Sequence, residues 1–313
     1  MSRNFGLGSR NMDYAGLLAL KKEMLSFSSV TTESSRWGQF VKWLKPQGIN
    51  RMEHVEREDI LRYGEYLLYR IECEELGVAT VHNYLSAVNR VFNIARRDKK
   101  LWVSPVDDCG VPERSGICTE SKACNDGKHA EAKQNVSERT AILMGLQRMF
   151  GLRFEESCKL DAKRGLREAS ALQKLTIEAG TKGGRQRLLP ILMPDQLLVL
   201  EKASEVQGSH YSMIPSGLTY VEFQRQAYRE ASAVKLHFHS ERHAYAHARY
   251  LVEAGCECPV VSGYAHGLAH HKYVADKLGC TVNEAREIDC QVRMKIAREL
   301  GHARIQITNS YYG

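Results

Sequence analysis

The sequence has no long apolar run. Its longest greasy stretch, Leu188–Met193, is closed by Pro194 and falls far short of the roughly 20 residues that a membrane-spanning helix needs. The amino-terminal segment MSRNFGLGSR has no apolar block after its arginine, so no secretory signal peptide is predicted. We therefore expect a cytoplasmic protein with no membrane contact.

A disulfide framework is also excluded. The nine cysteines are an odd number, and without a secretion signal reduced thiols are expected. Internal repeats and low-complexity tracts are absent. With 43% hydrophobic and 26% charged residues, the chain is an ordinary globular one rather than a fibrous or disordered one.

Acidic residues are outnumbered, 37 against 44 basic ones, which gives a formal net charge of +7. This modest excess suits a polyanionic partner without proving one. One basic cluster ends a predicted helix over residues 80–97, and it contains Arg96, Arg97, Lys99 and Lys100. Such a cluster can bind phosphates or can simply be a solvated helix end.

The length of 313 residues suggests two domains. Apolar residues at helical spacing predict a helical amino-terminal domain over residues 1–104. Residues 105–136 carry scattered proline and glycine without apolar periodicity and are predicted to be a linker. The second domain then covers residues 137–313.

Helices and one hairpin are predicted in the second domain. Candidate strands over 172–181 and 185–192 flank the turn Lys182-Gly183-Gly184, a fair hairpin signal. The last long helix begins with a capping-box pattern, Thr281 and Glu284, and ends at Gly301. The predicted fold class is mainly α with a small antiparallel sheet (α+β).

Four short patterns have chemical potential, and their order is more informative than any one of them. They are Gly151-Leu152-Arg153 followed by Glu156; Thr181-Lys182-Gly183-Gly184-Arg185; His239-Ser240-Glu241-Arg242-His243; and Leu300-Gly301-His302 followed by Ile305, Thr308 and Tyr311.

Together these patterns resemble the tyrosine recombinase (phage integrase) family, whose motif is Arg, Lys, His-x-x-Arg, His or Trp, and Tyr in this chain order. The motif covers residues 139–313, and the amino-terminal helices are similar to the family's core-binding domain. The resemblance implies a DNA-binding domain over 1–104, a catalytic domain over 137–313, and a clamp around duplex DNA.

The resemblance also implies the activity. It predicts a site-specific recombinase, or integrase, of a mobile genetic element that acts in the bacterial nucleoid. Such an enzyme cleaves and rejoins DNA through a covalent 3′-phosphotyrosine, with no metal, ATP or other cofactor. The implied partners are double-stranded DNA, three further copies in a homo-tetramer that assembles on DNA from monomers, and accessory DNA-bending or directionality proteins.

The chemistry of the motif residues agrees with this activity. A phosphodiester repels nucleophiles, and arginine forks aimed at its oxygens offset the charge that builds during attack. Arg153 and Arg242 are the predicted clamp. Tyr311 is the predicted nucleophile, and Lys182, at the hairpin tip, is the predicted general acid for the leaving 5′ oxygen.

The remaining motif residues are expected to assist. His239 is predicted to accept the tyrosine proton, His302 to donate a hydrogen bond to the phosphate, and Glu156 to orient the site. Arg185 and Arg187 are predicted DNA-phosphate contacts. Two alternatives stay open at this point: Glu156 as a plain surface carboxylate, and Tyr312 as the nucleophile in place of Tyr311.

The 60 positions between Arg242 and His302 exceed the family's usual interval, so an insertion is predicted at about 256–287. Its cysteines and histidines lack paired CxxC spacing, and no metal site is predicted. A stripe of histidines at 239, 243 and 247 leaves a metal-dependent nuclease as one alternative. A non-catalytic DNA-binding regulator of the same fold is another.

Overall fold

The computed structural model describes residues 3–24 and 26–313. The chain divides into two compact units, one up to Ser115 and the other from Gly116 to Gly313. Each unit has its own hydrophobic core, and each is described by itself below.

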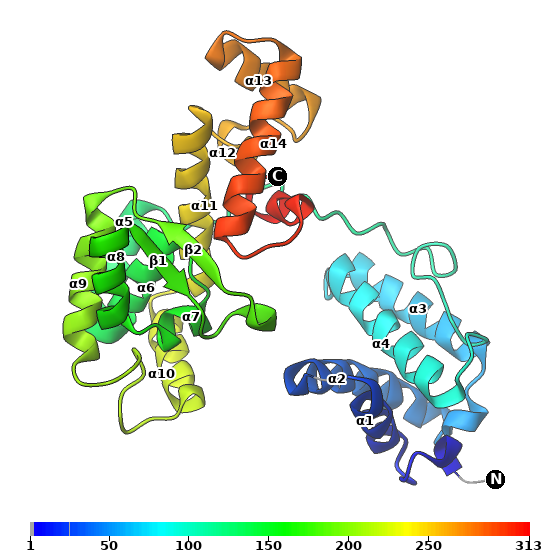
Figure 1. The fold of residues 1–313 in the computed structure, drawn as a ribbon. Helices are drawn as coiled ribbons and strands as arrows, with labels where there is room; N and C mark the ends of the chain where they lie inside the picture. Colours follow the sequence, from blue (N-terminus) through cyan, green and yellow to red (C-terminus); the bar gives the residue numbers. More distant parts are fainter. Residues whose placement is uncertain (1–2, 25) are drawn as a thin grey trace. The chain divides into compact units, whose positions relative to one another are not determined.

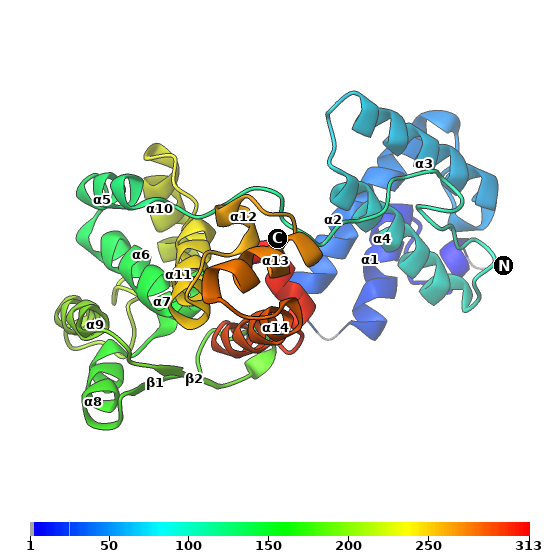
Figure 2. The ribbon, with the colours of Figure 1, turned by 90° about the horizontal axis from the view of Figure 1, so that it is seen from above.

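In the described residues, the first unit contains four α-helices, with one 3₁₀ turn before the first helix and two between the second and third (Figures 1 and 2). They are α1 (Met12–Glu23), α2 (Phe27–Leu44), α3 (Arg57–Glu72) and α4 (Val78–Arg96), and the turns are η1 (Arg3–Gly6), η2 (Lys45–Gln47) and η3 (Met52–His54).

Aromatic rings fill the core of the first unit. Trp37 on α2 is fully buried and lies edge-on to Phe92 of α4, with ring centroids 5.4 Å apart. Helix α1 approaches this ring at Gly16, where an added Cβ would lie 2.1 Å from the indole nitrogen of Trp37. The indole N–H also donates to the backbone oxygen of Met12. The absence of a side chain at Gly16 therefore sets the distance between α1 and α2.

The second unit is also mostly helical. Its elements are α5 (Asp126–Gln134), α6 (Glu138–Phe150), α7 (Phe154–Lys159), α8 (Ala162–Leu172), β1 (Lys174–Ile177), η4 (Lys182–Gly184), β2 (Arg187–Pro190), α9 (Pro194–Gln207), α10 (Tyr220–Ala233), α11 (Phe238–Ala254), α12 (Pro259–Ser262), α13 (Leu268–Leu278), α14 (Val282–Glu299), η5 (Ile305–Thr308) and α15 (Asn309–Tyr312).

Strands β1 and β2 form a two-stranded antiparallel sheet in which Leu175 pairs with Leu189 and Ile177 pairs with Arg187. Side chains alternate between the two faces of a strand, so Leu189 and Arg187 share the buried face while Leu188 is exposed. This register decides where Arg187 points. The strands are shorter than predicted, because α8 continues to Leu172 and residues 178–186 form a longer connection.

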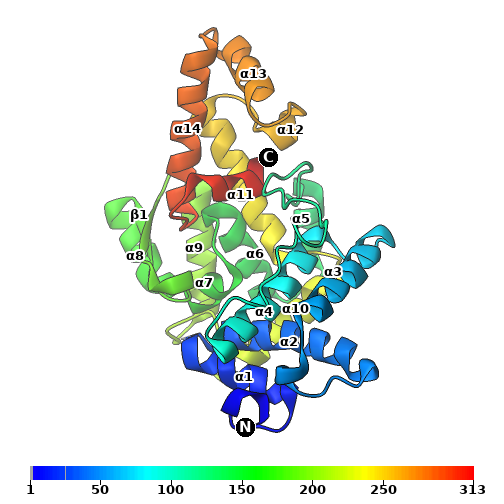
Figure 3. The same ribbon diagram turned by 90° about the vertical axis from the view of Figure 1, so that its right-hand side faces the viewer.

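The predicted insertion is helical. It contains α12, α13 and the first turn of α14, and α13 and α14 lie side by side in two views at right angles (Figures 1 and 3). The predicted capping box is present, since Thr281 and Glu284 exchange hydrogen bonds between side chain and backbone. Helix α14 then leads through Gly301 to the short η5 and α15 at the end of the chain.

The fold class is confirmed as mainly α with a small antiparallel sheet. The structure differs from the predicted linker over 105–136, because residues 126–134 form α5. Asn125 caps this helix through the backbone N–H of Lys128, and its apolar side is too short to give a periodic signal. Among the helices that the structure describes, none is long and apolar enough to cross a membrane.

The contact at Gly16 gives the first prediction. Gly16→Ala should destabilise the first unit by about 2 kcal/mol, because the methyl group would overpack the Trp37 ring. Gly77→Ala is the control, since Gly77 has a φ of −79° and no atom within 4 Å of an added Cβ. Urea unfolding followed by tryptophan fluorescence measures both. Equal losses in the two variants would contradict the close approach of α1 to Trp37.

Candidate active site

Arg242 is the centre of the candidate site. It lies on the first turns of α11, and its side chain is fully buried. The guanidinium donates to the backbone oxygens of Gly151 and Leu300. Its Nε donates to the hydroxyl of Tyr311 at 3.0 Å. One side chain thus joins the end of α6, the turn after α14 and the α15 segment.

Gly151 allows this junction to form. It ends α6 in the left-handed conformation, with φ of 59°, which glycine adopts without steric cost. An added Cβ would lie 2.5 Å from the ring of Tyr245. The Gly151-Leu152-Arg153 motif therefore has a structural reason: the glycine turns the chain so that its carbonyl meets Arg242.

Arg153 begins α7, two residues further on. Its guanidinium donates to Glu156 at 2.8 Å and to the backbone oxygen of Leu300 at 3.3 Å. The side chain keeps 23% of its surface exposed. Arg153 and Arg242 therefore meet at the carbonyl of Leu300, one of them partly open to solvent and the other enclosed.

Glu156 is buried rather than a surface carboxylate. Burial by itself raises the pKa of this carboxyl, but the hydrogen bonds and charges of Arg187 and Arg153 outweigh burial and lower the pKa to about 2. The ionised carboxylate accepts a hydrogen bond from each terminal nitrogen of Arg187, at 2.7 and 2.6 Å. It thus fixes the orientation of two arginines beside the site.

The structure differs from the prediction at Arg187. This side chain was predicted to contact DNA phosphate, but it is buried, with Glu156 at one end and the backbone oxygen of Glu299 on its Nε at 2.7 Å. The reason is the register of the sheet, which places Arg187 on the inner face of β2. Arg187 lies two residues after Arg185 in the same hairpin. The sequence alone does not distinguish a buried arginine there from an exposed one.

Tyr311 is brought to the site by α15 and is only 3% exposed. Besides the contact with Arg242, its hydroxyl lies 3.4 Å from Nε2 of His302. The adjacent Tyr312 is buried too, but its hydroxyl has no hydrogen-bond partner in the described structure, and its ring packs on Tyr250. The geometry thus brings Tyr311, and not Tyr312, to the arginines.

His302 faces these groups as a hydrogen-bond acceptor. Its Nε2 lies 3.3 Å from a terminal nitrogen of Arg242, and a guanidinium can only donate. Burial, together with the charges of Arg242, Arg153 and Arg187, lowers the pKa of His302 to about 3. The imidazole is therefore neutral, with its lone pair toward Arg242 and the Tyr311 hydroxyl. The predicted role was the opposite one of donor to a phosphate.

His239 lies at the rim of the site. It is exposed, and its ring centroid is 5.9 Å from that of Tyr311. Its pKa is lowered by partial burial and by the charges of Arg242, Arg153 and Lys122. No hydrogen bond joins His239 to any residue in the ranges 3–24 and 26–313. It is free to meet a group that enters from solvent.

Two further histidines contact the tyrosine segment, which is residues 309–313. The His243 ring lies 4.6 Å from that of Tyr311, and Nε2 of His247 binds the backbone oxygen of Tyr311 at 2.8 Å. Their spacing of four along α11 is visible in the sequence. There it indicated a metal-dependent nuclease as an alternative, rather than contacts with Tyr311. Among the described residues, no group of three or more His, Cys, Asp or Glu side chains is arranged to hold a metal ion.

Lys182 is not brought to the cluster. It lies in η4, in the long connection between β1 and β2, and is exposed. Within residues 3–24 and 26–313, neither Lys182 nor Arg185 has a hydrogen bond or ion pair. Gly183 and Gly184, with φ of 76° and 69°, allow this turn. No hydrogen bond or ion pair among the described residues therefore joins Lys182 to the site.

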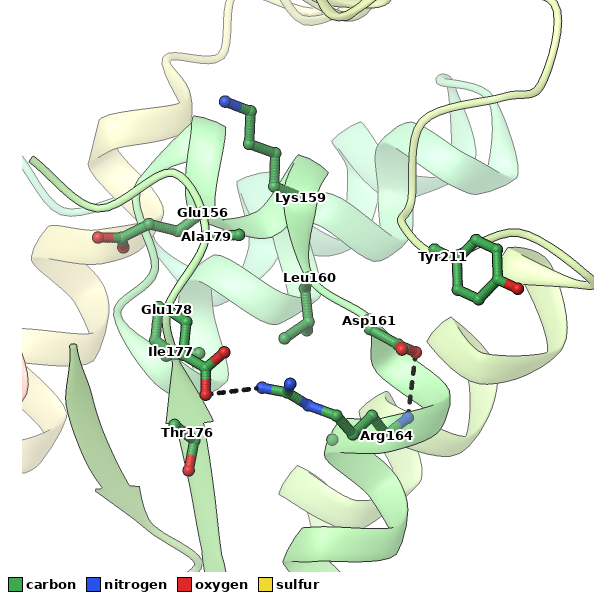
Figure 4. Close-up of a pocket in the computed structure, with 11 residues that line it drawn as sticks. Glu156, Lys159, Leu160, Asp161, Arg164, Thr176, Ile177, Glu178, Ala179 and Tyr211 are labelled. Atoms are coloured by element: carbon green, nitrogen blue, oxygen red, sulfur yellow. Dashed lines mark hydrogen bonds and ion pairs between the residues drawn. The ribbon is translucent and has the colours of Figure 1, made fainter. Parts of the chain in front are cut away.

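A pocket of about 250 Å³ lies beside the sheet and is not part of this site (Figure 4). In the close-up, the Glu156 carboxylate points away from it. Arg164 lines the pocket and pairs with Glu178 at 3.1 Å. The active-site candidates therefore belong to the other face of α7.

The basic cluster of the first unit is only partly free. Arg96 donates to Asp98 and lies over the Phe5 ring at 5.7 Å. Arg97 ends α4 in the left-handed conformation, with φ of 60°. Arg97, Lys99 and Lys100 are exposed. Three of the four predicted phosphate contacts are therefore available to a partner.

Comparison with solved structures identifies the fold. A dimer of lambda integrase bound to a COC′ core site has a TM-score of 0.54 at 15% identity, covering 88% of this chain and 75% of that one. A Tn1549 transposon integrase fragment in complex with transposon right end DNA has a TM-score of 0.57 at 10% identity, covering 100% and 95%. A lambda integrase tetramer bound to a Holliday junction has a TM-score of 0.52 at 16% identity, covering 87% and 74%. The fold is that of tyrosine recombinases.

A sequence match covers the middle part of the chain. The family model described as integrase matches residues 115–248, which include the Arg153, Lys182 and His239–Arg242 patterns. No curated protein matches this chain. The predicted resemblance to the tyrosine recombinases of the phage integrase type is confirmed over this segment.

The position of Arg187 gives the second prediction. Arg187→Met should destabilise the second unit by about 3 kcal/mol, because it leaves the buried Glu156 carboxylate short of a cation. Arg185→Met, at an exposed position without a partner, should change stability by less than about 0.5 kcal/mol. Urea unfolding measures both. An unchanged midpoint in Arg187→Met would contradict the structural role.

The buried histidines give the third prediction, on pH. Burial, and the charges of His239 and His247, lower the pKa of His243 from 6.5 to about 3. Below pH 6.5 the unfolded chain takes up a proton that the folded chain excludes, so this contribution to stability is present above pH 6.5 and lost as the pH falls toward 3.

His243→Phe keeps the ring beside Tyr311 but does not titrate. The decrease in unfolding free energy between pH 7.5 and pH 5 should therefore be about 2 kcal/mol smaller in this variant than in the wild type. Urea titrations at the two pH values measure this difference. Parallel pH dependence in the two proteins would show that His243 is protonated normally in the folded state.

Proposed function

We propose that this protein is a site-specific DNA recombinase in which Tyr311 attacks a DNA phosphodiester and forms a covalent 3′-phosphotyrosine. The observation that carries the proposal is the hydroxyl of Tyr311 held between Nε of Arg242 and Nε2 of His302. The match of residues 115–248 to the integrase family model and the fold support it.

Arg153 and Arg242 would bind the non-bridging oxygens of the phosphate. In the free protein, the guanidinium of Arg242 donates hydrogen bonds to Gly151, Leu300, His302 and Tyr311. A phosphate must therefore compete with the contacts to Tyr311 and His302, whereas the backbone contacts can persist. Guanidinium groups held in place by such contacts stabilise developing charge without reorganisation. Glu156 contributes by keeping Arg153 oriented.

A proton must leave Tyr311 as it attacks. Nε2 of His302 has its lone pair beside the hydroxyl, which favours His302 over His239 as the first acceptor. A bound phosphate adds negative charge that raises the pKa of this buried imidazole and makes it a better base. His239, unpartnered at the rim, is then placed to bind the phosphate. This exchanges the roles predicted for the two histidines.

Lys182 remains the proposed general acid, delivered by movement of the connection between β1 and β2. Its exposed position and the two following glycines are consistent with such movement. The lysine would protonate the 5′ oxygen as the phosphorus–oxygen bond breaks. The phosphotyrosine then preserves the bond energy, so rejoining requires neither ATP nor a metal ion.

The proposed partners are double-stranded DNA and further copies of this chain. Exposed Arg97, Lys99, Lys100 and Arg185 would bind the backbone with salt-dependent affinity. Strand exchange joins two duplexes, so we propose a tetramer on DNA, formed from monomers and assisted by accessory proteins of a mobile genetic element. The neighbours described as a DNA-bound dimer and tetramer of lambda integrase are consistent with this. The proposed place of action is the cytoplasm, at the nucleoid.

The fourth prediction tests the covalent step. Nicked duplex DNA from the ends of the element encoding this protein is incubated with the protein in EDTA, and SDS-resistant adducts are measured. The wild type and Tyr312→Phe should form the adduct, whereas Tyr311→Phe should form none, because the attacking oxygen is missing. Arg153→Ala should bind the DNA but form adduct at least about 100-fold more slowly.

Each other outcome would change either the nucleophile or the function assigned to the protein. Loss of the adduct in Tyr312→Phe alone would move the nucleophile by one residue. Specific DNA binding without any adduct would favour a non-catalytic regulator. Cleavage that requires added metal would favour a nuclease and overturn the proposal.

A further inference from the structure

A buried ionic network lies on α14, away from the site arginines. Asp289 and Arg293 are one turn apart, 5% and 3% exposed, and Nε of Arg293 lies 2.9 Å from both carboxylate oxygens of Asp289. The proposed chemistry uses neither residue. Burial of a charged pair is costly unless every partner is satisfied, so the remaining contacts of this pair are informative.

The terminal nitrogens of Arg293 bind the tyrosine segment. One terminal nitrogen binds the side-chain oxygen of Asn309 at 3.1 Å, and both terminal nitrogens bind the backbone oxygen of Gly313 at 3.2 Å. The guanidinium also lies 5.3 Å from the ring centroid of Tyr312. These contacts fall on both sides of Tyr311, so they restrain where its ring and hydroxyl can lie.

The insertion supports the same pair. The hydroxyl of Tyr250 donates to Asp289 at 2.5 Å. That hydroxyl is also 3.0 Å from Nε2 of His270 on α13, and since its one proton goes to Asp289, His270 must donate to it. Nε2 of His271 lies 3.6 Å from the other oxygen of Asp289. Side chains from α11 and α13 thus converge on the carboxylate that holds Arg293.

We propose that Arg293 is a positioning residue for the nucleophile, and that the insertion over 256–287 acts by bracing it through Asp289. The brace holds Tyr311 beside Arg242 of its own chain. The role in attack rests on the proposed function; the restraint of the segment does not. Two further backbone contacts, from His247 to Tyr311 and from Cys118 to Asn309, allow the chain to fold when the brace is weakened.

The restraint is tested first, without DNA. Arg293→Gln removes the charge and the paired hydrogen bonds to Gly313. Arg286→Gln, the control, removes the same charge from an exposed position on the same helix. Hydrogen–deuterium exchange of residues 303–313 should be about 10-fold faster or more in Arg293→Gln, and unchanged in Arg286→Gln. Because Arg293→Gln can also destabilise the whole unit, Arg293→Lys serves as a milder second variant, with intermediate exchange expected.

The catalytic consequence is tested with the nicked DNA. Arg293→Gln should bind this DNA within about 3-fold of the wild type but form the adduct about 100-fold more slowly, since displacement of a reacting group by 1 Å has effects of this size. Arg293→Lys should recover part of the rate. A merely structural role would instead lower the amount of active protein and leave the rate per active molecule unchanged.

The outcomes separate the two proposals. Wild-type-like exchange and adduct rates in Arg293→Gln would overturn the positioning role and leave the recombinase function intact. Faster exchange in Arg293→Gln, with no adduct from the wild type, would support the restraint and count against the function.

Discussion

The structure of the site depends on the burial of one arginine. Arg242 has no accessible surface, and its guanidinium donates to the carbonyls of Gly151 and Leu300. A buried cation is tolerated only when strong acceptors surround it. Here the acceptors come from the end of α6 and the turn after α14, so these two regions must meet for Arg242 to be satisfied. The same requirement brings Tyr311 into place, because its hydroxyl completes the set.

A second layer of charge keeps this arrangement rigid. Glu156 is held ionised by Arg187 and Arg153, and Arg187 reaches on to the carbonyl of Glu299, next to Leu300. Three arginines therefore converge near one carboxylate and two neighbouring carbonyls, and the local charge is positive. Burial and this excess of positive charge together lower the pKa of His302 and His239, and the positive charge favours binding of an anion.

The tyrosine segment is short and has little core of its own. Its position depends on polar contacts from several elements: His247 of α11, Arg293 of α14 and the backbone of Cys118. Helices from the insertion reach the same segment through Asp289. The predicted insertion between two motif residues is therefore part of the framework that holds Tyr311, in addition to lengthening the chain. Its helical hairpin, α13 against α14, supplies the rigid base that such polar contacts require.

Several features were predictable from the sequence, because local chemistry determines them. Helical periodicity gave the fold class, glycine gave the turn after α6, and the capping box gave the start of α14. The motif order gave Arg153, Arg242, His302 and Tyr311, which the structure assembles. Arg187 was misassigned because strand register, which decides the face of a side chain, depends on pairing with β1. The role of His302 as an acceptor depends on which donor faces it across the fold, and Arg293 lies in no motif. The sequence by itself therefore determined the resemblance to the integrase family, the helices and the candidate reactive groups, since these follow from residue type and spacing. Only the tertiary structure decided which charges are buried together and which lone pair faces the tyrosine, because burial and hydrogen-bond direction arise from contacts between residues far apart in the chain.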